Sequence, residues 1–267
     1  MATVMVNGLP GPMATAVALE VVKRNLQLAP MSLCGPSRSG TVNVESVVVQ
    51  LCPPNEHDKA MEDARAKYTD LVVVDCTQPH VCTDNTRLYA KHKVDFVMVA
   101  TGGDVAEMQR LVKDAGLRAV IAPNMCKAIV ALQSMLQHMG EKYPNALSGF
   151  KLNLTESHQA TKKDTSGTAR AMVGNFNKLG VPFSVEDIKQ IRDEEQSKAL
   201  GVPETALNGH AFHTYDLQNE SVQLQFQHNV VGRHSYAQGT VDAVLFLMKQ
   251  TPGVYNMINV LESGMIS

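Results

Sequence analysis

Short apolar runs alternate with longer amphipathic segments over the first half of the chain, from residue 3 to about residue 128. The apolar runs are rich in β-branched residues and predict strands at residues 3–6, 46–51, 71–75, 96–100 and 119–121, with a further candidate at 31–34. The segments between them have helical periodicity and predict helices at 14–25, 58–67, 81–91 and 105–115. Such alternation is typical of βαβ units, so we expect an α/β domain with a doubly wound parallel sheet.

The pattern changes at residue 150, where apolar and polar positions begin to alternate strictly. Residues 150–155 and 222–227 each predict a strand with one dry face and one polar face. A helix predicted at 127–143 leads into this region, and another at 242–250 returns the chain to the first domain. We therefore expect an α+β second domain built on a mostly antiparallel sheet.

Charge and cysteine content narrow the class of function. The formal net charge is −2, which gives no electrostatic reason to expect nucleic acid or an anionic membrane as partner. The five cysteines contain no C-x-x-C pair, so we predict neither a disulfide framework nor a zinc ribbon, and no metal site. The apolar runs are too short to span a bilayer, and no targeting peptide is visible. These features favour a soluble protein of a reducing compartment that acts on a small molecule.

The turn after the first predicted strand resembles an imperfect dinucleotide fingerprint. Gly8 and Gly11 stand where a chain bends sharply and lets a pyrophosphate approach a helix N-terminus. Pro10 replaces the middle glycine and has no N–H to donate, whereas Ala14 at the third glycine position is small enough for helix packing. The motif alone leaves two alternatives open, a cofactor site and an ordinary glycine and proline loop. The candidate cofactor contacts here are Gly8, Leu9, Pro10, Gly11, Pro12 and Met13.

Residues 34–40 contain no acidic residue that could take the ribose hydroxyls of NAD. Arg38 beside the hydroxyl of Ser37 instead suits a 2′-phosphate, so the hypothesis is a preference for NADPH, with NADH accepted less well. The alternative is a solvated loop arginine.

Three further strand ends carry residues that could contact the nicotinamide half, because ligands bind at the carboxyl ends of such strands. The alternative for the two threonines is that they cap the helices that follow. These candidates are Cys76 and Thr77, then Ala100, Thr101 and Gly102, and finally Ala122, Pro123, Asn124 and Met125.

Residues 156–169 concentrate groups that suit an anionic substrate. Ser166, Gly167 and Thr168 precede a predicted helix at 169–179, and their N–H groups and hydroxyls would favour a carboxylate. Lys162 adds positive charge, and His158 is expected to titrate near neutrality, where it can donate or accept a proton. Taken singly, the histidine could be structural and the Ser-Gly-Thr a helix cap.

This segment resembles the E-x-H-H/Q-x-x-K-x-D-(x)-S-G-T-A motif of the dihydrodipicolinate reductases, also called 4-hydroxy-tetrahydrodipicolinate reductases. Gln159 in place of the second histidine, and the missing residue before Ser166, are similar to the plant-type branch. The similarity extends over nearly the whole chain, with further matches at residues 209–213, 228–233 and 236–243.

The resemblance implies a Rossmann-like dinucleotide domain of residues 1–128 and 234–267, and a substrate and tetramerisation domain of residues 129–233 with an open mixed sheet. It implies transfer of a hydride from NADPH to dehydrated hydroxy-tetrahydrodipicolinate, in the diaminopimelate route to lysine. It assigns proton transfer to His158 and Lys162, and the substrate carboxylates to Gln159, Lys162, Ser166, Gly167 and Thr168.

A plastid location would follow for a plant or algal protein, and a cytoplasmic one otherwise. Two alternatives stay open: a non-catalytic NADPH-binding regulatory protein on the same scaffold, which the imperfect fingerprint allows, and a purely structural oligomerising protein.

Overall fold

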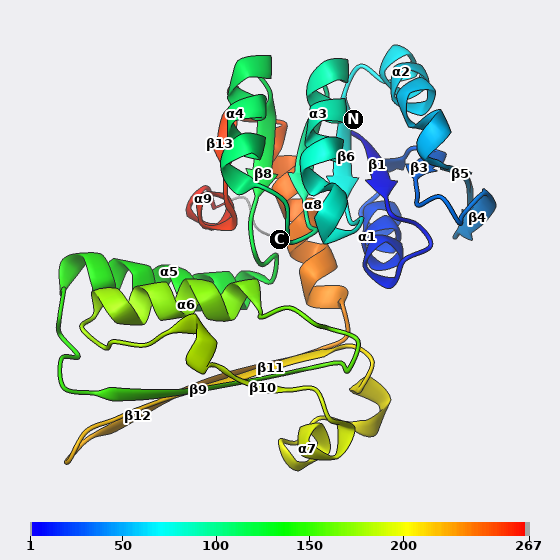
Figure 1. The fold of residues 1–267 in the computed structure, drawn as a ribbon. Coiled ribbons are helices and arrows are strands. Elements are labelled where there is room, and N and C mark those ends of the chain that lie inside the picture. Colours follow the sequence, from blue (N-terminus) through cyan, green and yellow to red (C-terminus); the bar gives the residue numbers. More distant parts are fainter. Residues whose placement is uncertain (1, 265–267) are drawn as a thin grey trace. The chain divides into compact units, whose positions relative to one another are not determined.

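The computed structural model describes residues 2–264, which form two compact units (Figure 1). One unit contains the described residues up to Lys127 together with those from His234 onward, and the other is Ala128–Arg233. No helix among residues 2–264 is long and apolar enough to cross a bilayer.

The first unit is built on a six-stranded sheet in which every neighbouring pair of strands is parallel. All residues of β1 and β6 are buried, as expected for strands covered on both faces. The strand order reverses between β1 and β6, and such a switch point is where doubly wound sheets bind ligands. Along the sheet the strands are β13 (Gly253–Tyr255), β8 (Arg118–Ile121), β7 (Asp95–Met98), β6 (Leu71–Asp75), β1 (Thr3–Asn7) and β2 (Gln27–Leu28).

Helices cover both faces of this sheet (Figure 1). On one face lie α2 (His57–Lys67), α3 (Cys82–His92) and α4 (Val105–Ala115), which share a core with β6 and β7. On the other face α1 (Pro12–Lys23) packs against α8 (His234–Leu247), and α9 (Met257–Glu262) follows. The predicted Rossmann-like α/β class is therefore confirmed.

One prediction about this sheet is wrong. The predicted strands 31–34 and 46–51 form as β3 (Met31–Leu33) and β5 (Val47–Cys52), but they pair in a separate three-stranded sheet with β4 (Gly40–Val44). The strand that extends the main sheet next to β1 is the two-residue β2, which is too short to have a hydrophobic period. The predicted helix at 242–250 is also misplaced, since α8 begins at His234 and ends at Leu247.

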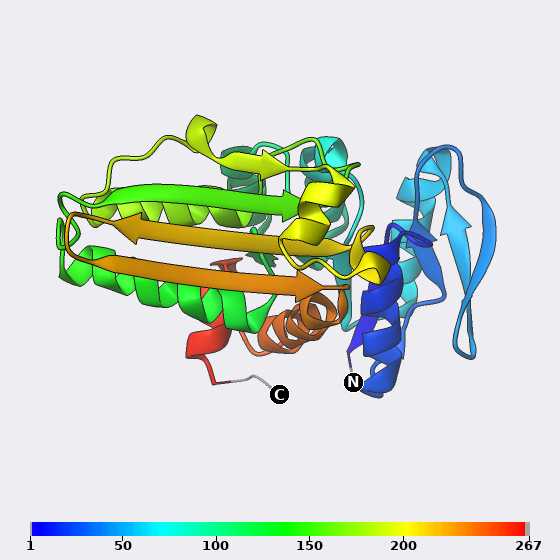
Figure 2. The same cartoon turned by 90° about the horizontal axis from the view of Figure 1, so that it is seen from below.

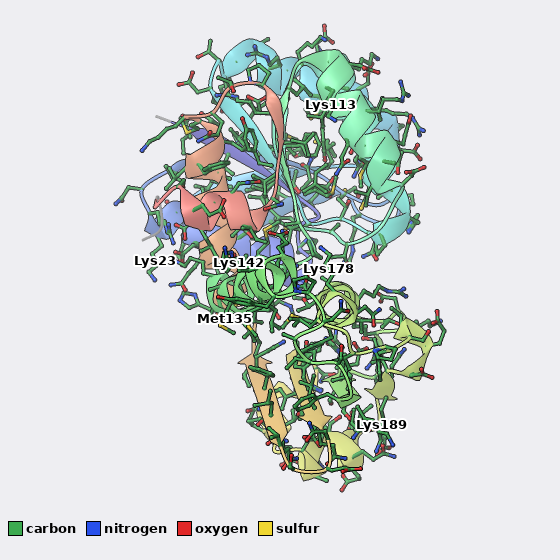
Figure 3. The ribbon with its side chains drawn as sticks, turned by 90° about the vertical axis from the view of Figure 1, so that its left-hand side faces the viewer. Lys23, Lys113, Met135, Lys142, Lys178 and Lys189 are labelled. Carbon is green, nitrogen blue, oxygen red and sulfur yellow. The ribbon has the colours of Figure 1, made fainter. Side chains whose placement is uncertain are left out.

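The second unit contains a four-stranded mixed sheet in the order β10 (Lys189–Ile191), β9 (Lys151–His158), β11 (His210–Gln218) and β12 (Gln223–Val231). The pairs of β11 are antiparallel, and β10 is parallel to β9. Helices α5 (Lys127–Lys142) and α6 (Gly167–Lys178) cover the face that carries Leu152, Leu154 and Tyr215. Gly140 lets these helices approach closely, because a Cβ there would lie 3.1 Å from Cβ of Lys178, which is labelled in Figure 3.

The opposite face of the four-stranded sheet is largely polar, as the alternating pattern predicts. It carries Asn153, Asp216, Gln225 and Gln227 from three neighbouring strands, and Figure 2 shows these strands in front of α5 and α6. A small apolar cluster of Val202, Ala206, Leu207 and Phe212 covers one end of this face. The short helices of the unit are α7 (Glu194–Ala199) and two 3-10 turns, Val185–Asp187 and Glu204–Ala206.

Candidate active site

The turn after β1 has room only for glycine at its two key positions. Gly8 has φ +100, and a Cβ there would lie 2.7 Å from the carbonyl oxygen of Cys76, the residue that follows β6. A Cβ at Gly11 would lie 2.7 Å from the carbonyl oxygen of Gly8. The structure therefore brings the loops after β1 and β6 into contact at the switch point of the sheet.

Most N–H groups of this turn already donate hydrogen bonds to other groups of the protein. The N–H of Gly8 donates to the Leu33 carbonyl (2.8 Å), that of Leu9 to Oγ of Ser32 (3.2 Å), and that of Gly11 to the Gly8 carbonyl (2.8 Å). Pro10 and Pro12 have none to donate. The amides of Met13 and Ala14 lie in the first turn of α1, where a helix has no intrahelical acceptor, and Gly11 supplies no side-chain cap. These two amides are the donors that fit a pyrophosphate.

A buried network of hydrogen bonds connects the end of β1, which leads into this turn, to β6 and α3. The carboxylate of Asp75 accepts hydrogen bonds from Tyr89 Oη (2.6 Å) and from Asn85 Nδ2 (2.8 Å). Tyr89 Oη also accepts one from Asn7 Nδ2 (3.0 Å), and Asn7 Oδ1 accepts one from the N–H of Leu33 (2.9 Å). Burial and the neighbouring Asp75 raise the pKa of Tyr89 well above its usual value, so its hydroxyl stays protonated.

The two threonines predicted near the nicotinamide are not helix caps, so that alternative is wrong. Thr77 Oγ1 donates to Asp75 Oδ1 (2.5 Å), and the N-cap of α3 is Val81, without a side-chain cap. The N-cap of α4 is Asp104 rather than Thr101. The loops after β6 and β7 touch, because a Cβ at Gly102 would lie 2.5 Å from Cβ of Pro79.

The remaining cofactor candidates differ in accessibility. Ser37 and Arg38 are exposed on the loop between β3 and β4, where the N–H of Arg38 closes a turn on the Gly35 carbonyl (3.1 Å). Met125 is buried, and its carbonyl oxygen would lie 1.8 Å from a Cβ at Gly239 of α8. Asn124 Oδ1 accepts from the N–H of Cys126 (2.7 Å). The segment after β8 is thus held closely against the helix that follows the second unit in sequence.

In the second unit, a buried carboxylate contacts the predicted catalytic loop, residues 159–166, which connects β9 to α6. Glu156 of β9 is fully buried, and its Oε1 accepts from Nη2 of Arg192 at 2.5 Å. Its Oε2 accepts from the N–H of Ser166 at 3.0 Å, which ties the start of α6 back to the strand. The N–H of Ser166 is thus used within the fold, and its Oγ caps α6 by accepting from the N–H of Ala169 (3.4 Å), which leaves its O–H as the group that could bind a substrate carboxylate. Gly167 and Thr168 supply the next amides of the helix N-terminus.

Two histidines lie beside this carboxylate. His158 Nδ1 lies 3.8 Å from Glu156 Oε1, and His213 Nε2 lies 3.9 Å from Glu156 Oε2. The two rings meet edge to face at 5.0 Å between centroids, and His228 stacks on His213 at 4.6 Å. Within residues 2–264, Nδ1 of His158 and both ring nitrogens of His213 are buried without a hydrogen-bond partner.

The expectation that His158 titrates near neutrality is wrong for this state of the protein. Burial, followed by the charges of Lys162 and Arg192, lowers the pKa of His158 to about 3. The ring is therefore neutral at pH 7, and a negative charge entering its surroundings would raise its pKa. Burial also lowers the pKa of His213 well below its usual value and that of His228 to about 4.

The ligand atoms of Glu156, His158 and His213 lie within 4.8 Å of one another, a spacing that could hold a metal ion. The charges oppose this use. Both oxygens of Glu156 already accept hydrogen bonds, one of them from the Arg192 guanidinium, and Lys162 adds a second positive charge near His158. The Glu156 carboxylate is thus already compensated by a cationic partner, which makes it a weaker ligand for a metal ion.

Lys162 is the other predicted proton-transfer residue. Its Nζ pairs with Asp164 at 2.8 Å, and its side chain is 19% exposed. Gln159 is partly buried one residue beyond His158, and its carbonyl accepts the N–H of Lys162 (2.9 Å). The predicted substrate residues therefore lie in the loop between β9 and α6 and in the first turn of α6.

Comparison with known proteins identifies the family. The model of the dihydrodipicolinate reductase N-terminus matches residues 2–125, and that of its C-terminus matches residues 128–261. The chain belongs to the dihydrodipicolinate reductase family. The resemblance seen in the sequence is thereby confirmed.

Plant members of the family are similar over nearly the whole chain. A probable 4-hydroxy-tetrahydrodipicolinate reductase 1, chloroplastic, from Oryza sativa subsp. japonica is 43% identical over 98% of this chain and 79% of its own length. The Arabidopsis thaliana 4-hydroxy-tetrahydrodipicolinate reductase 2, chloroplastic, is 42% identical over 98% of this chain and 78% of its own length.

Solved structures share the fold at low identity. A dipicolinate-bound dihydrodipicolinate reductase from Paenisporosarcina sp. TG-14 has a TM-score of 0.63 and 17% identity, covering 96% of this chain and 97% of that one. The WlbA dehydrogenase from Thermus thermophilus, in complex with NAD and alpha-ketoglutarate, has a TM-score of 0.53 and 12% identity, covering 95% and 97%.

Sequence reasoning assigned no role to Glu156, Arg192 or His213. The spacing of Glu156 and His158 placed both on one face of a strand, which was a usable signal. Arg192 and His213 follow in later segments, and no local pattern relates them to the loop.

Proposed function

We propose that this protein reduces 4-hydroxy-tetrahydrodipicolinate, through its dehydrated form, to tetrahydrodipicolinate. The observation that carries the proposal is the complete 156–169 segment in a chain that belongs to the family, with His158 at the end of β9, Lys162 in the loop that follows, and Gly167 at the start of α6. The reaction is a step of the diaminopimelate route to lysine.

The first unit holds a nicotinamide dinucleotide in this proposal. The amides of Met13 and Ala14 fit the pyrophosphate, and Gly8 and Gly11 keep the turn close to the sheet edge. Residues Cys76 to Thr77, Ala100 to Gly102 and Ala122 to Met125 follow the next strands at the same edge of the sheet and would contact the nicotinamide half. When bound, the cofactor supplies the hydride.

Arg38 directs the choice of cofactor. It is exposed beside Ser37 on the loop that begins after Leu33, whose carbonyl accepts the N–H of Gly8. A guanidinium and a hydroxyl suit the dianionic 2′-phosphate of NADPH, and NADH lacks that group. We therefore propose NADPH as the preferred cofactor.

The substrate carboxylates are assigned to the second unit. The amides of Gly167 and Thr168 open α6 and favour an anion, and Lys162 supplies positive charge. Gln159 cannot titrate as a histidine would, so its part is to hydrogen-bond the substrate.

Proton transfer is assigned to His158 and Lys162. The imidazole of His158 is neutral in the free protein because burial and nearby cations lower its pKa to about 3. A bound dicarboxylate would raise the pKa of His158, because nearby negative charge stabilises the imidazolium form. Substrate binding would thus lead to protonation of His158, and this proton would complete the reduction.

Two further proposals concern the whole protein. The polar face of the four-stranded sheet is the surface on which a homotetramer would assemble. The chloroplastic names of the plant relatives support a plastid location.

A coupled assay tests the proposed activity. The condensation product of pyruvate and aspartate semialdehyde is supplied as substrate, and oxidation of NADPH is followed. Rapid oxidation that depends on this substrate is expected. Folded protein that binds NADPH yet shows no oxidation would instead favour the alternative, a non-catalytic NADPH-binding regulator on the same scaffold.

A further inference from the structure

Arg192 sits at the end of β10, beside the strand that leads into the catalytic loop. The parallel pairing of β10 with β9 places Gln190 opposite Glu156 and Ile191 opposite Ser157. The next residue along, Arg192, is therefore level with His158, and its side chain is 19% exposed. None of the segments that carry the resemblance, residues 156–169, 209–213, 228–233 and 236–243, includes this arginine.

The guanidinium of Arg192 donates to the backbone of the catalytic loop at two points. Its Nε donates to the Lys162 carbonyl (2.8 Å), and its Nη2 to the Asp164 carbonyl (3.2 Å). The same Nη2 donates to Oε1 of Glu156 (2.5 Å), whose other oxygen accepts the N–H of Ser166. Arg192 thus holds the middle of the loop, and Glu156 holds its end at Ser166.

These hydrogen bonds fix the positions of two groups that are assigned to the substrate. The Lys162 ammonium is bound by the Asp164 carboxylate at 2.8 Å, so fixing the backbone of both residues fixes the charged group of Lys162. Fixing Ser166 likewise fixes the first turn of α6, where Gly167 and Thr168 present their amides. Both sets of groups assigned to the substrate depend on this one ion pair.

Stability alone does not account for such an arrangement. A buried ion pair contributes little to folding, because desolvation of the charges offsets their attraction. A lysine would keep the charge, but its single ammonium cannot replace a planar fork that donates in several fixed directions. The geometry calls for a guanidinium in particular.

We propose that Arg192 is a positioning residue of the reductase: through Glu156 and the carbonyls of Lys162 and Asp164, it holds the loop in the form that receives the substrate dicarboxylate. This inference rests on the proposed function. Arg192 acts through the loop and is not assigned a contact with the substrate.

The test uses Arg192→Ala and Arg192→Lys in the full-length protein, with dipicolinate as the dicarboxylate probe. For Arg192→Ala we expect dipicolinate affinity to fall at least about tenfold and kcat/KM to fall about a hundredfold, as displacement by an ångström can cause. Affinity for NADPH should stay within about twofold of wild type, since the cofactor is assigned to the other unit. Millimolar guanidinium should restore at least about a tenth of the lost kcat/KM, because it can reoccupy the same hydrogen bonds.

Arg110→Ala is the matched control, because Arg110 pairs with Glu107 and Asp114 on the exposed face of α4. It should keep wild-type kinetics and show no gain with guanidinium, and urea should rescue neither variant. If Arg192→Ala does not fold, Arg192→Lys carries the test, with the same expected loss of dipicolinate affinity.

Wild-type dipicolinate affinity and kcat/KM in a folded Arg192 variant would overturn the inference. So would a loss confined to the amount of folded protein, with dipicolinate affinity per folded molecule unchanged. Failure of the proposed function is distinguishable, because wild-type protein itself would then neither turn over the substrate nor bind dipicolinate.

Discussion

His158 shows how a residue's surroundings alter the chemistry that its type suggests. A histidine in water titrates near pH 6.5, whereas burial and two nearby cations lower the pKa of this one to about 3. The free protein therefore presents a neutral ring close to the Lys162 ammonium and the Arg192 guanidinium. That combination suits a residue that is protonated only together with an anionic substrate.

Replacement of His158 by Gln tests its assignment as proton donor. Glutamine keeps a polar side chain but cannot titrate, so kcat should fall at least about a hundredfold. Binding of NADPH, measured by calorimetry, should be unaffected. Unchanged turnover would remove His158 from the proton-transfer step and leave Lys162 as the only donor assigned.

Replacement of Arg38 by Ala tests the cofactor preference. Loss of a charged hydrogen bond to the 2′-phosphate should raise KM for NADPH about tenfold or more, and KM for NADH should not change. Steady-state kinetics with both cofactors measure the effect. An equal rise in KM for both cofactors would show that Arg38 does not bind the 2′-phosphate.

In the helices, glycine is required where another segment of the chain packs so closely against the helix that a Cβ has no room. Helix propensity does not decide these positions. Gly239 of α8 faces the carbonyl oxygen of Met125, which a Cβ would approach to 1.8 Å, whereas a Cβ at Gly174 of α6 would have no neighbour within 4 Å. Both glycines lie inside a helix, where alanine is intrinsically the better residue.

The two glycines form a matched pair for mutation. Gly239→Ala should lower the free energy of unfolding by about 1–3 kcal/mol or more, because the helix must shift away from the segment after β8. Gly174→Ala should raise it by about 0.5–1 kcal/mol through reduced backbone entropy of the unfolded chain. Urea unfolding measures both, and similar effects of the two changes would contradict the assigned close contact.

The histidines on the covered face of the four-stranded sheet make the protein sensitive to acid. The folded-state pKa values of His158 (about 3) and His228 (about 4) lie below the unfolded value of 6.5, so the unfolded chain binds more protons between these limits. Their contribution to stability is therefore complete above about pH 6.5 and is lost as the pH falls toward 4 and 3.

Replacement of His228 by Phe isolates part of this effect. The stacked ring is retained against His213, although the hydrogen bond between Tyr215 Oη and His228 Nε2 (3.1 Å) is lost. At pH 5 the number of protons taken up on unfolding should fall by about one, as read from the slope of unfolding free energy against pH. A slope equal to that of wild type would mean that His228 is protonated in the folded protein.

At the scale of the whole molecule, the polar sheet face bears on assembly. Neighbouring strands present Asp216, Gln225 and Gln227 on the face that α5 and α6 leave uncovered (Figure 2). Native mass spectrometry should give four times the mass of the chain. Gln225→Lys together with Gln227→Lys should reduce the assembly to smaller species, because like charges would meet across the interface. A wild-type monomer would contradict the tetramer.

The local patterns of the sequence determined the element types and the position of the catalytic loop. Strand β6 and helix α4 begin and end where their periodicity predicts, because side-chain burial repeats every two residues in a strand and about every 3.6 in a helix. The polar 156–169 segment was recognisable because its histidine, lysine and Ser-Gly-Thr are close in the chain. The family and fold class followed from these motifs and are confirmed.

The tertiary structure alone decided which strands pair and what state the site groups are in. The local pattern of β3 and β5 could not reveal that they form a sheet of their own. The N–H of Ser166 is taken by Glu156, and Glu156 is paired with an arginine 36 residues away. The neutral state of His158 likewise follows from burial and from Arg192, which is brought to it by the pairing of β10 with β9. Such properties depend on contacts between distant segments, and residue order alone does not specify those distances.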